Sequence, residues 1–138
     1  MSVRLSGHTY QKMLAHARAS LPNEACGLLA GVEADGVRDI REVYLLTNTD
    51  ASNEHFTMDP REQLAAVKDI RAKGLKPLGN WHSHPESPSR PSAEDVRLAY
   101  DPTASYLILS LESREAPNLN AFRIRDGKYE WEILELYD

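Results

Sequence analysis

Stretches with helical periodicity alternate with short apolar runs along this chain, and that alternation limits the folds it can adopt. Three stretches have the apolar spacing of helices and begin at common helix caps: residues 6–21 at Ser6, 59–74 at Asp59 and 92–100 at Ser92. Apolar runs of strand length occupy residues 26–32, 37–46, 76–81, 106–109, 121–125 and 129–133. Strands interleaved with helices predict an α/β fold, with a mixed sheet flanked by about three helices.

The composition is that of an ordinary globular domain. The 138 residues are 41% hydrophobic and 27% charged, which fits one domain over residues 1–138. A single cysteine cannot form an internal disulfide, so we expect a reducing, cytoplasmic setting. The net charge of −5 disfavours a nucleic-acid partner. No apolar run approaches the roughly 18 residues of a membrane span, so no membrane partner is expected.

The last two predicted strands carry opposite charges in alternation with apolar residues. Arg123 and Arg125 lie on the first strand of this hairpin, and Glu130 and Glu132 lie on the second. The spacing predicts that the arginines and glutamates pair across the strands on a solvent-exposed face.

The segment from Asn80 to Asp95 concentrates the side chains that could carry chemistry. His82 and His84 stand two residues apart at a strand end, so both imidazoles point to one side. Asp95, in the first turn of the next helix, can add an oxygen ligand, and three protein ligands with one open position are typical of catalytic zinc. A lone His-x-His pair is weak evidence for a metal, and Ser92 with Asp95 also fits a capping box. Those simpler interpretations do not explain why all four residues share one short segment.

The spacing of these residues matches a known motif. His-x-His-Pro, six residues, Ser, two residues and Asp describe residues 82–95 at every fixed position. This resembles the JAMM motif of the MPN metallopeptidase family, in which a glutamate lies upstream, and Glu24 at the entry to strand 26–32 matches that glutamate. The resemblance covers nearly the whole chain and is to the short, bacterial-type members. It implies a single MPN-type domain with a mixed, curved, cytidine-deaminase-like sheet.

The resemblance also implies a role for each residue of the motif. His82, His84 and Asp95 would hold one Zn²⁺, with water as the fourth ligand. Glu24 would take a proton from that water as general base and pass it to the leaving amine. Ser92 would donate its hydroxyl to the oxyanion of the tetrahedral intermediate.

The substrate class follows from the same resemblance. Family members cut amide or isopeptide bonds at the C-terminal tail of ubiquitin-like proteins, and short bacterial members act on sulfur-carrier proteins. The implied partner is therefore a ubiquitin-like or sulfur-carrier protein with a Gly-Gly tail, bound by strand addition. The particular carrier, the bond type, the pathway and the oligomeric state stay open.

Several neighbouring residues have a simpler structural interpretation. Cys26 shares a strand face with Glu24, and burial as a small residue is favoured over a role as nucleophile or fourth ligand. Trp81 is expected to pack in the core, and Ser83 to face away from the metal ligands. Arg90 could contact substrate, although a solvated charge is favoured. The remaining histidines are expected to be surface or helix residues: His8, His16 and His55.

Three other functions compete with the peptidase. A catalytically silent MPN scaffold would typically have lost ligands, and a RadC-like DNA-repair-associated protein fits the acidic charge poorly. A peptidase acting on cell-wall peptides would usually need export or a wall-binding domain.

Overall fold

The computed structural model describes residues 2–138 of the chain. Its elements are β1 Ser2–Ser6, α1 Gly7–Ser20, β2 Cys26–Ala34, β3 Val37–Leu46, α2 Pro60–Ala72, β4 Lys76–His84, α3 Ala93–Arg97, β5 Ser105–Ser110, β6 Asn118–Arg125 and β7 Lys128–Tyr137. Within those residues the fold is α/β with three helices and a mixed sheet, which confirms the predicted class.

The strands form one sheet that closes on itself. Their order is β1-β3-β2-β4-β5-β6-β7, and closure occurs because β1 pairs with both β3 and β7. The pairs that β1 makes and the β4–β5 pair are parallel, and the others are antiparallel. Strand β1 was not predicted from the sequence. Val3 and Leu5 are fully buried there, but the strands that pair with β1 lie far along the chain.

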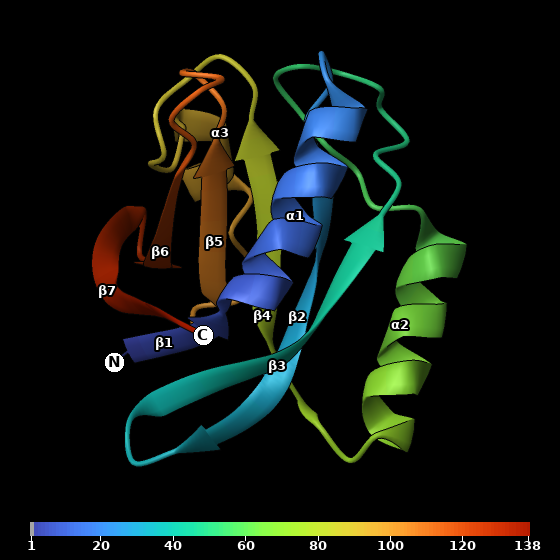
Figure 1. Ribbon diagram of the computed structural model, residues 1–138, viewed down its shortest axis with the longest axis vertical. Helices are drawn as coiled ribbons and strands as arrows, with labels where there is room; N and C mark the ends of the chain where they lie inside the picture. The colour runs from blue at the N-terminus through green and yellow to red at the C-terminus, as the bar shows by residue number, and fades with distance from the viewer. Residues whose placement is uncertain (1) are drawn as a thin grey trace.

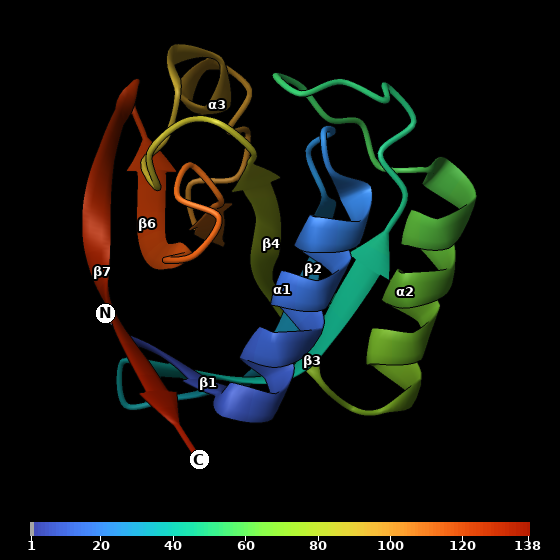
Figure 2. The same cartoon turned by 45° about the horizontal axis from the view of Figure 1, so that its top comes forward.

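The helices cover the sheet at different places. The Ser6 hydroxyl accepts a hydrogen bond from the Thr9 amide at 3.1 Å, and the Asp59 carboxylate caps α2 in the same way, so both predicted caps are confirmed. In Figure 1, α1 crosses the face of β2 and β3, and α2 stands beside β3. Figure 2 shows that α3 and the loop after β3 both lie at the end of the molecule where β4 ends. None of the helices between residues 2 and 138 has the length and apolar character needed to cross a bilayer.

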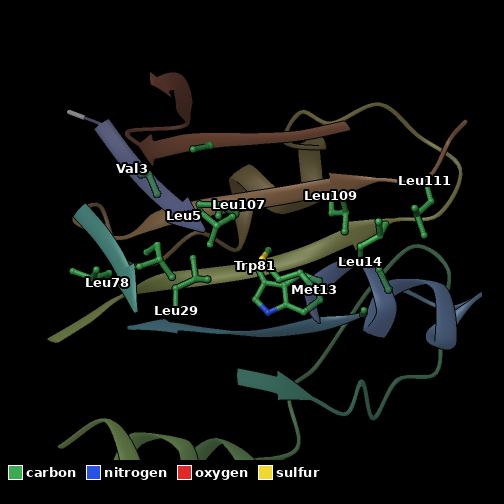
Figure 3. Packing of buried hydrophobic residues seen from close by; sticks show 14 residues of the cluster. Val3, Leu5, Met13, Leu14, Leu29, Leu78, Trp81, Leu107, Leu109 and Leu111 are labelled. Carbon is green, nitrogen blue, oxygen red and sulfur yellow. The ribbon is translucent and has the colours of Figure 1, made fainter. Parts of the chain in front are cut away.

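Trp81 anchors the main core, as predicted. Its side chain is fully buried, and its indole N–H donates to the Tyr44 carbonyl at 3.2 Å. Figure 3 shows it beside Met13 of α1. A Cβ at Gly27 would lie 2.3 Å from the indole nitrogen and 1.7 Å from the Tyr44 carbonyl oxygen. Glycine at position 27 therefore permits the close approach of β2 and β3 beneath this ring.

The hairpin of β6 and β7 corrects one prediction. The cross-strand pairs form, with Arg123–Glu132 at 3.5 Å and Arg125–Glu130 at 3.7 Å. The solvent-exposed face was wrong for Glu132, which is buried, whereas Trp131 is 62% and Ile133 is 73% exposed. Leu134 lies on the same strand face as Glu132 and packs against the main core, so closure of the sheet turns this face inward.

The third helix is shorter than predicted. It ends at Arg97 instead of Tyr100. The chain turns there, and both Val96 and Ala99 pack against the cluster around Phe122. Tyr100 is left 83% exposed.

Candidate metal and catalytic site

The end of β4 presents two imidazoles on one face of the sheet, as the period-two geometry predicted. The Nε2 atoms of His82 and His84 lie 3.1 Å apart, and Asp95 Oδ2 lies 3.2 Å from the first and 3.0 Å from the second. Ligand atoms about 2.0–2.1 Å from a tetrahedral zinc are separated from one another by about 3.3 Å. The three atoms therefore form a triangle of the size that one face of a zinc tetrahedron requires.

Asp95 is held in place by the start of α3. Ser92 Oγ accepts from the Asp95 amide at 3.0 Å, and Asp95 Oδ2 accepts from the Ser92 amide at 2.9 Å. This capping box confirms the structural role of Ser92. Burial alone would raise the pKa of Asp95, but the hydrogen bonds with His82 and His84 outweigh it and hold the pKa far below its usual range. Asp95, the third candidate ligand, is therefore ionised.

The rings of His82 and His84 are oriented by different contacts. His84 Nδ1 lies 2.9 Å from the Pro88 carbonyl oxygen, which favours the tautomer with Nε2 free to bind a metal. Burial lowers the pKa of His84, but the Asp95 and Pro88 hydrogen bonds dominate and give a net increase. His82 Nδ1 is buried with no hydrogen-bond partner among residues 2–138. Its ring stacks instead on Phe56 at a centroid distance of 4.8 Å.

Glu24 precedes β2 and brings a second carboxylate to the site. Its amide donates to the Ser52 carbonyl at 2.8 Å, and its carbonyl accepts from Asn48 Nδ2 at 3.1 Å. The residue is 4% exposed, and Oε1 has no hydrogen-bond partner within the described residues. Burial raises the pKa of Glu24 to about 8. A cation bound nearby would lower that pKa and leave a carboxylate able to accept a proton.

Ser83 faces away from the ligands, as predicted, yet it touches the site through the backbone. Its hydroxyl accepts from the Ala25 amide at 2.8 Å, one residue after Glu24. Its own amide donates to the Ala25 carbonyl at 3.0 Å. No local sequence signal indicates this positioning role, because only the pairing of β2 with β4 brings the two segments together. Cys26 is fully buried, and burial raises the pKa of its thiol to about 12, which fits the predicted structural role.

Two hollows meet at the ligand cluster. The Phe56 hollow, of about 300 Å³, is lined by Phe56, His82 and Asp95 among others. The Glu24 hollow, of about 320 Å³, contains Glu24, His84 and Ser92 in its wall. Glu54 and Glu94 line both hollows. All five candidate residues from the sequence therefore border the same divided cleft.

His55 also reaches this cleft. It is exposed, as predicted, but its Nδ1 lies 2.9 Å from the Glu94 carboxylate and its side chain lines the Phe56 hollow. The contact joins the loop after β3 to α3. No signal in the local sequence linked either His55 or Phe56 to the histidine motif.

Comparison with known proteins identifies the family to which this chain belongs. Residues 6–125 match the family described as prokaryotic homologs of the JAB domain. The chain belongs to the JAMM/MPN family. Among the relatives of this JAMM/MPN chain, a CysO-cysteine peptidase of Mycobacterium tuberculosis is 36% identical over 83% of this chain and 77% of its own. A desampylase of Haloferax volcanii is 34% identical over 80% of this chain and 81% of its own.

Solved structures agree with the JAMM/MPN assignment. The solution structure of a Desulfitobacterium hafniense protein has a TM-score of 0.91 and 51% identity, covering 99% of this chain and 93% of that one. A JAB1/MPN domain protein from Archaeoglobus fulgidus, at 24% identity, has a TM-score of 0.61 with 100% of both chains covered, and supports the fold alone.

The residues of this JAMM/MPN chain fit a zinc ion. His82, His84 and Asp95 supply borderline nitrogen and hard oxygen atoms within 4.8 Å of one another, and further protein ligands are not needed for a catalytic site. The buried, unpartnered Glu24 Oε1 adds an acceptor on the same cleft. The group can therefore bind a metal with a proton acceptor beside it.

Proposed function

We propose that this chain is a zinc-dependent peptidase or isopeptidase that hydrolyses an amide bond at the C-terminal tail of a ubiquitin-like protein. One observation carries the proposal. A triangle of ligand atoms from His82, His84 and Asp95 lies beside a buried glutamate whose Oε1 has no partner among the described residues. A structural metal site needs no such unpaired acceptor, whereas hydrolysis needs a group that moves a proton.

The side chains divide the work of hydrolysis. His82, His84 and Asp95 would hold a zinc ion, which would supply Lewis-acid chemistry by lowering the pKa of water and polarising the scissile carbonyl. Glu24 accepts a proton from the attacking water and delivers it to the leaving nitrogen. The C–N bond breaks, the water oxygen stays on the carbonyl carbon, and the amine departs with the proton. Ser92 Oγ accepts from the Asp95 amide, so its hydroxyl hydrogen is free to donate to the oxyanion.

The relatives support the choice of substrate. They are named for CysO-cysteine, for desampylation and, in Thermus thermophilus, for cleavage of TtuB-protein conjugates. We infer a partner of the same class, a ubiquitin-like or sulfur-carrier protein with a Gly-Gly tail. Glycines suit such a cleft because an extended tail without side chains can approach the metal ligands closely.

The first experiment measures zinc per chain in protein purified without added metal. Wild-type protein should carry about one zinc and His84→Ala little, because two ligands hold zinc weakly. Absence of zinc from the wild type, even after zinc is added, would contradict the proposal and favour a silent scaffold.

A second variant separates metal binding from catalysis. Glu24→Gln should keep zinc and lose cleavage of a sulfur-carrier protein extended beyond its Gly-Gly tail, because an amide cannot act as the base. Loss of zinc in Glu24→Gln would instead show that Glu24 is a ligand.

A further inference from the structure

Carboxylates line both hollows of the cleft around the His82, His84 and Asp95 cluster. The Glu24 hollow is lined by Glu24, Glu54 and Glu94, and the Phe56 hollow adds Asp95 and Asp101. Among the residues that the structure describes, no lysine or arginine lines either hollow. The charge of a zinc ion is balanced by Asp95 and Glu24, so the remaining glutamates leave the cleft negative.

Arg90 and Arg114 lie outside both hollows. Arg114 donates to the Pro85 and Leu111 carbonyls, so its guanidinium is already engaged. Arg90, on the loop after β4, is exposed and lines neither hollow.

The position of Glu24 indicates which hollow receives the leaving group. The proton that it carries goes to the leaving nitrogen, so the leaving group must lie on its side of the scissile bond. Glu24 is 4% exposed, its Oε1 is unpartnered within residues 2–138, and it forms part of the wall of the Glu24 hollow. The Glu24 hollow therefore receives the leaving group, and the Phe56 hollow receives the acyl tail. This step rests on the proposed function.

We propose that the site selects a leaving group without a free α-carboxylate: a lysine side-chain amine or the next residue of a longer chain. A single amino acid attached to the Gly-Gly tail would place its carboxylate among glutamates, with no lysine or arginine lining the hollows to receive it. Glu54 is the residue that imposes this selectivity. Glu94 shares its carboxylate with the His55 ring at 2.9 Å, whereas Glu54 makes no ion pair with any described residue.

Three substrates with one acyl part test the inference. A ubiquitin-fold sulfur-carrier protein ending in Gly-Gly is extended by cysteine as the free acid, by cysteine carboxamide, or by an Nε-linked lysine amide. The carboxamide and the lysine conjugate should have kcat/KM at least about tenfold above the free acid at low salt, equivalent to about 1.4 kcal/mol. Added salt should reduce the ratio of kcat/KM between these two substrates and the free acid, because salt screens charges at an exposed site.

Matched variants assign the effect to Glu54. Glu54→Gln should raise kcat/KM for the free acid and reduce the ratio about threefold, since one of several carboxylates is removed. Glu115→Gln, an exposed glutamate outside both hollows, should leave the ratio unchanged.

The outcomes separate this inference from the proposed function. Equal or faster cleavage of the free acid overturns the inference and leaves the hydrolase standing. A selective loss of free-acid cleavage in Arg90→Ala also overturns it, because that arginine would then receive the carboxylate. Failure to cleave any of the three substrates overturns both proposals.

Discussion

The buried carboxyl of Glu24 makes the stability of the metal-free protein depend on pH in a defined direction. Burial raises its pKa to about 8 from 4.5. A carboxyl whose folded pKa is raised contributes fully below the unfolded pKa, and that contribution is lost as pH rises through the folded pKa. At 1.36 kcal/mol per pKa unit, the free energy of unfolding falls by roughly 2.5 kcal/mol between about pH 5.5 and about pH 7.5, because folded Glu24 keeps a proton that the unfolded chain releases. Glu24→Gln has no proton to lose there and escapes this cost.

The assay is urea unfolding of wild type and Glu24→Gln in a chelator at both pH values. The variant's stability relative to wild type should rise by roughly 2–3 kcal/mol at the higher pH. His84, whose pKa is also raised, titrates in both proteins, but Glu24 is one cause of that increase, so the difference reports the coupled Glu24–His84 pair. Glu115→Gln is the matched control, because that glutamate is exposed, lies outside both hollows and should parallel the wild type.

Parallel pH curves for wild type and Glu24→Gln would refute the reasoning, since they would mean that the carboxyl is solvated when the protein is folded. Zinc adds a second check. A bound cation favours the ionised form of Glu24, so saturating zinc should flatten the pH dependence of the wild type.

Three other substitutions test single contacts. Ser92→Ala should lower turnover roughly 10²–10³-fold, because the oxyanion donor is lost. It should also lower the free energy of unfolding by about 1 kcal/mol, because the helix cap is lost. Unchanged turnover would show that Ser92 serves only as a cap. Phe56→Ala removes the ring stacked on His82, so the zinc Kd measured by chelator competition should rise at least about tenfold. An unchanged Kd would show that this stacking does not orient His82. A Cβ at Gly79 would lie 1.9 Å from the Ser105 carbonyl oxygen. Gly79→Ala should therefore lower the free energy of unfolding in urea by about 3 kcal/mol. A decrease below about 1 kcal/mol would contradict the close approach of β4 and β5.

Local signals predicted the parts of the fold whose causes are local. Ser6 and Asp59 cap their helices because a side-chain oxygen and an amide two or three residues on are enough. His82 and His84 point the same way because strand geometry alternates side chains. β1 could not be found in this way, since its five residues are a strand only where β3 and β7 flank them.

Alternation alone also cannot say which face of a strand turns inward. The pattern of β7 separates Trp131 and Ile133 from Glu132, and hydrophobicity favours burial of the first pair. Closure of the sheet buries the Glu132 face instead, where the glutamate meets Arg123 at 3.5 Å. A single pairing between distant strands therefore reverses an assignment that local composition supports.

The cleft shows the same division between local and distant causes. Its chemistry could be predicted from residue types and spacing, but its walls depend on the loop after β3. Asn48 Nδ2 donates to the carbonyls of both Glu24 and His55, at 3.1 and 2.9 Å, and the Ser52 carbonyl accepts from the Glu24 amide. One loop thus fixes the backbone of the proposed base and carries Glu54, the residue proposed to select the leaving group. A change that shifts the backbone of this loop will move both Glu54 and Glu24, so their positions are coupled through the same hydrogen bonds.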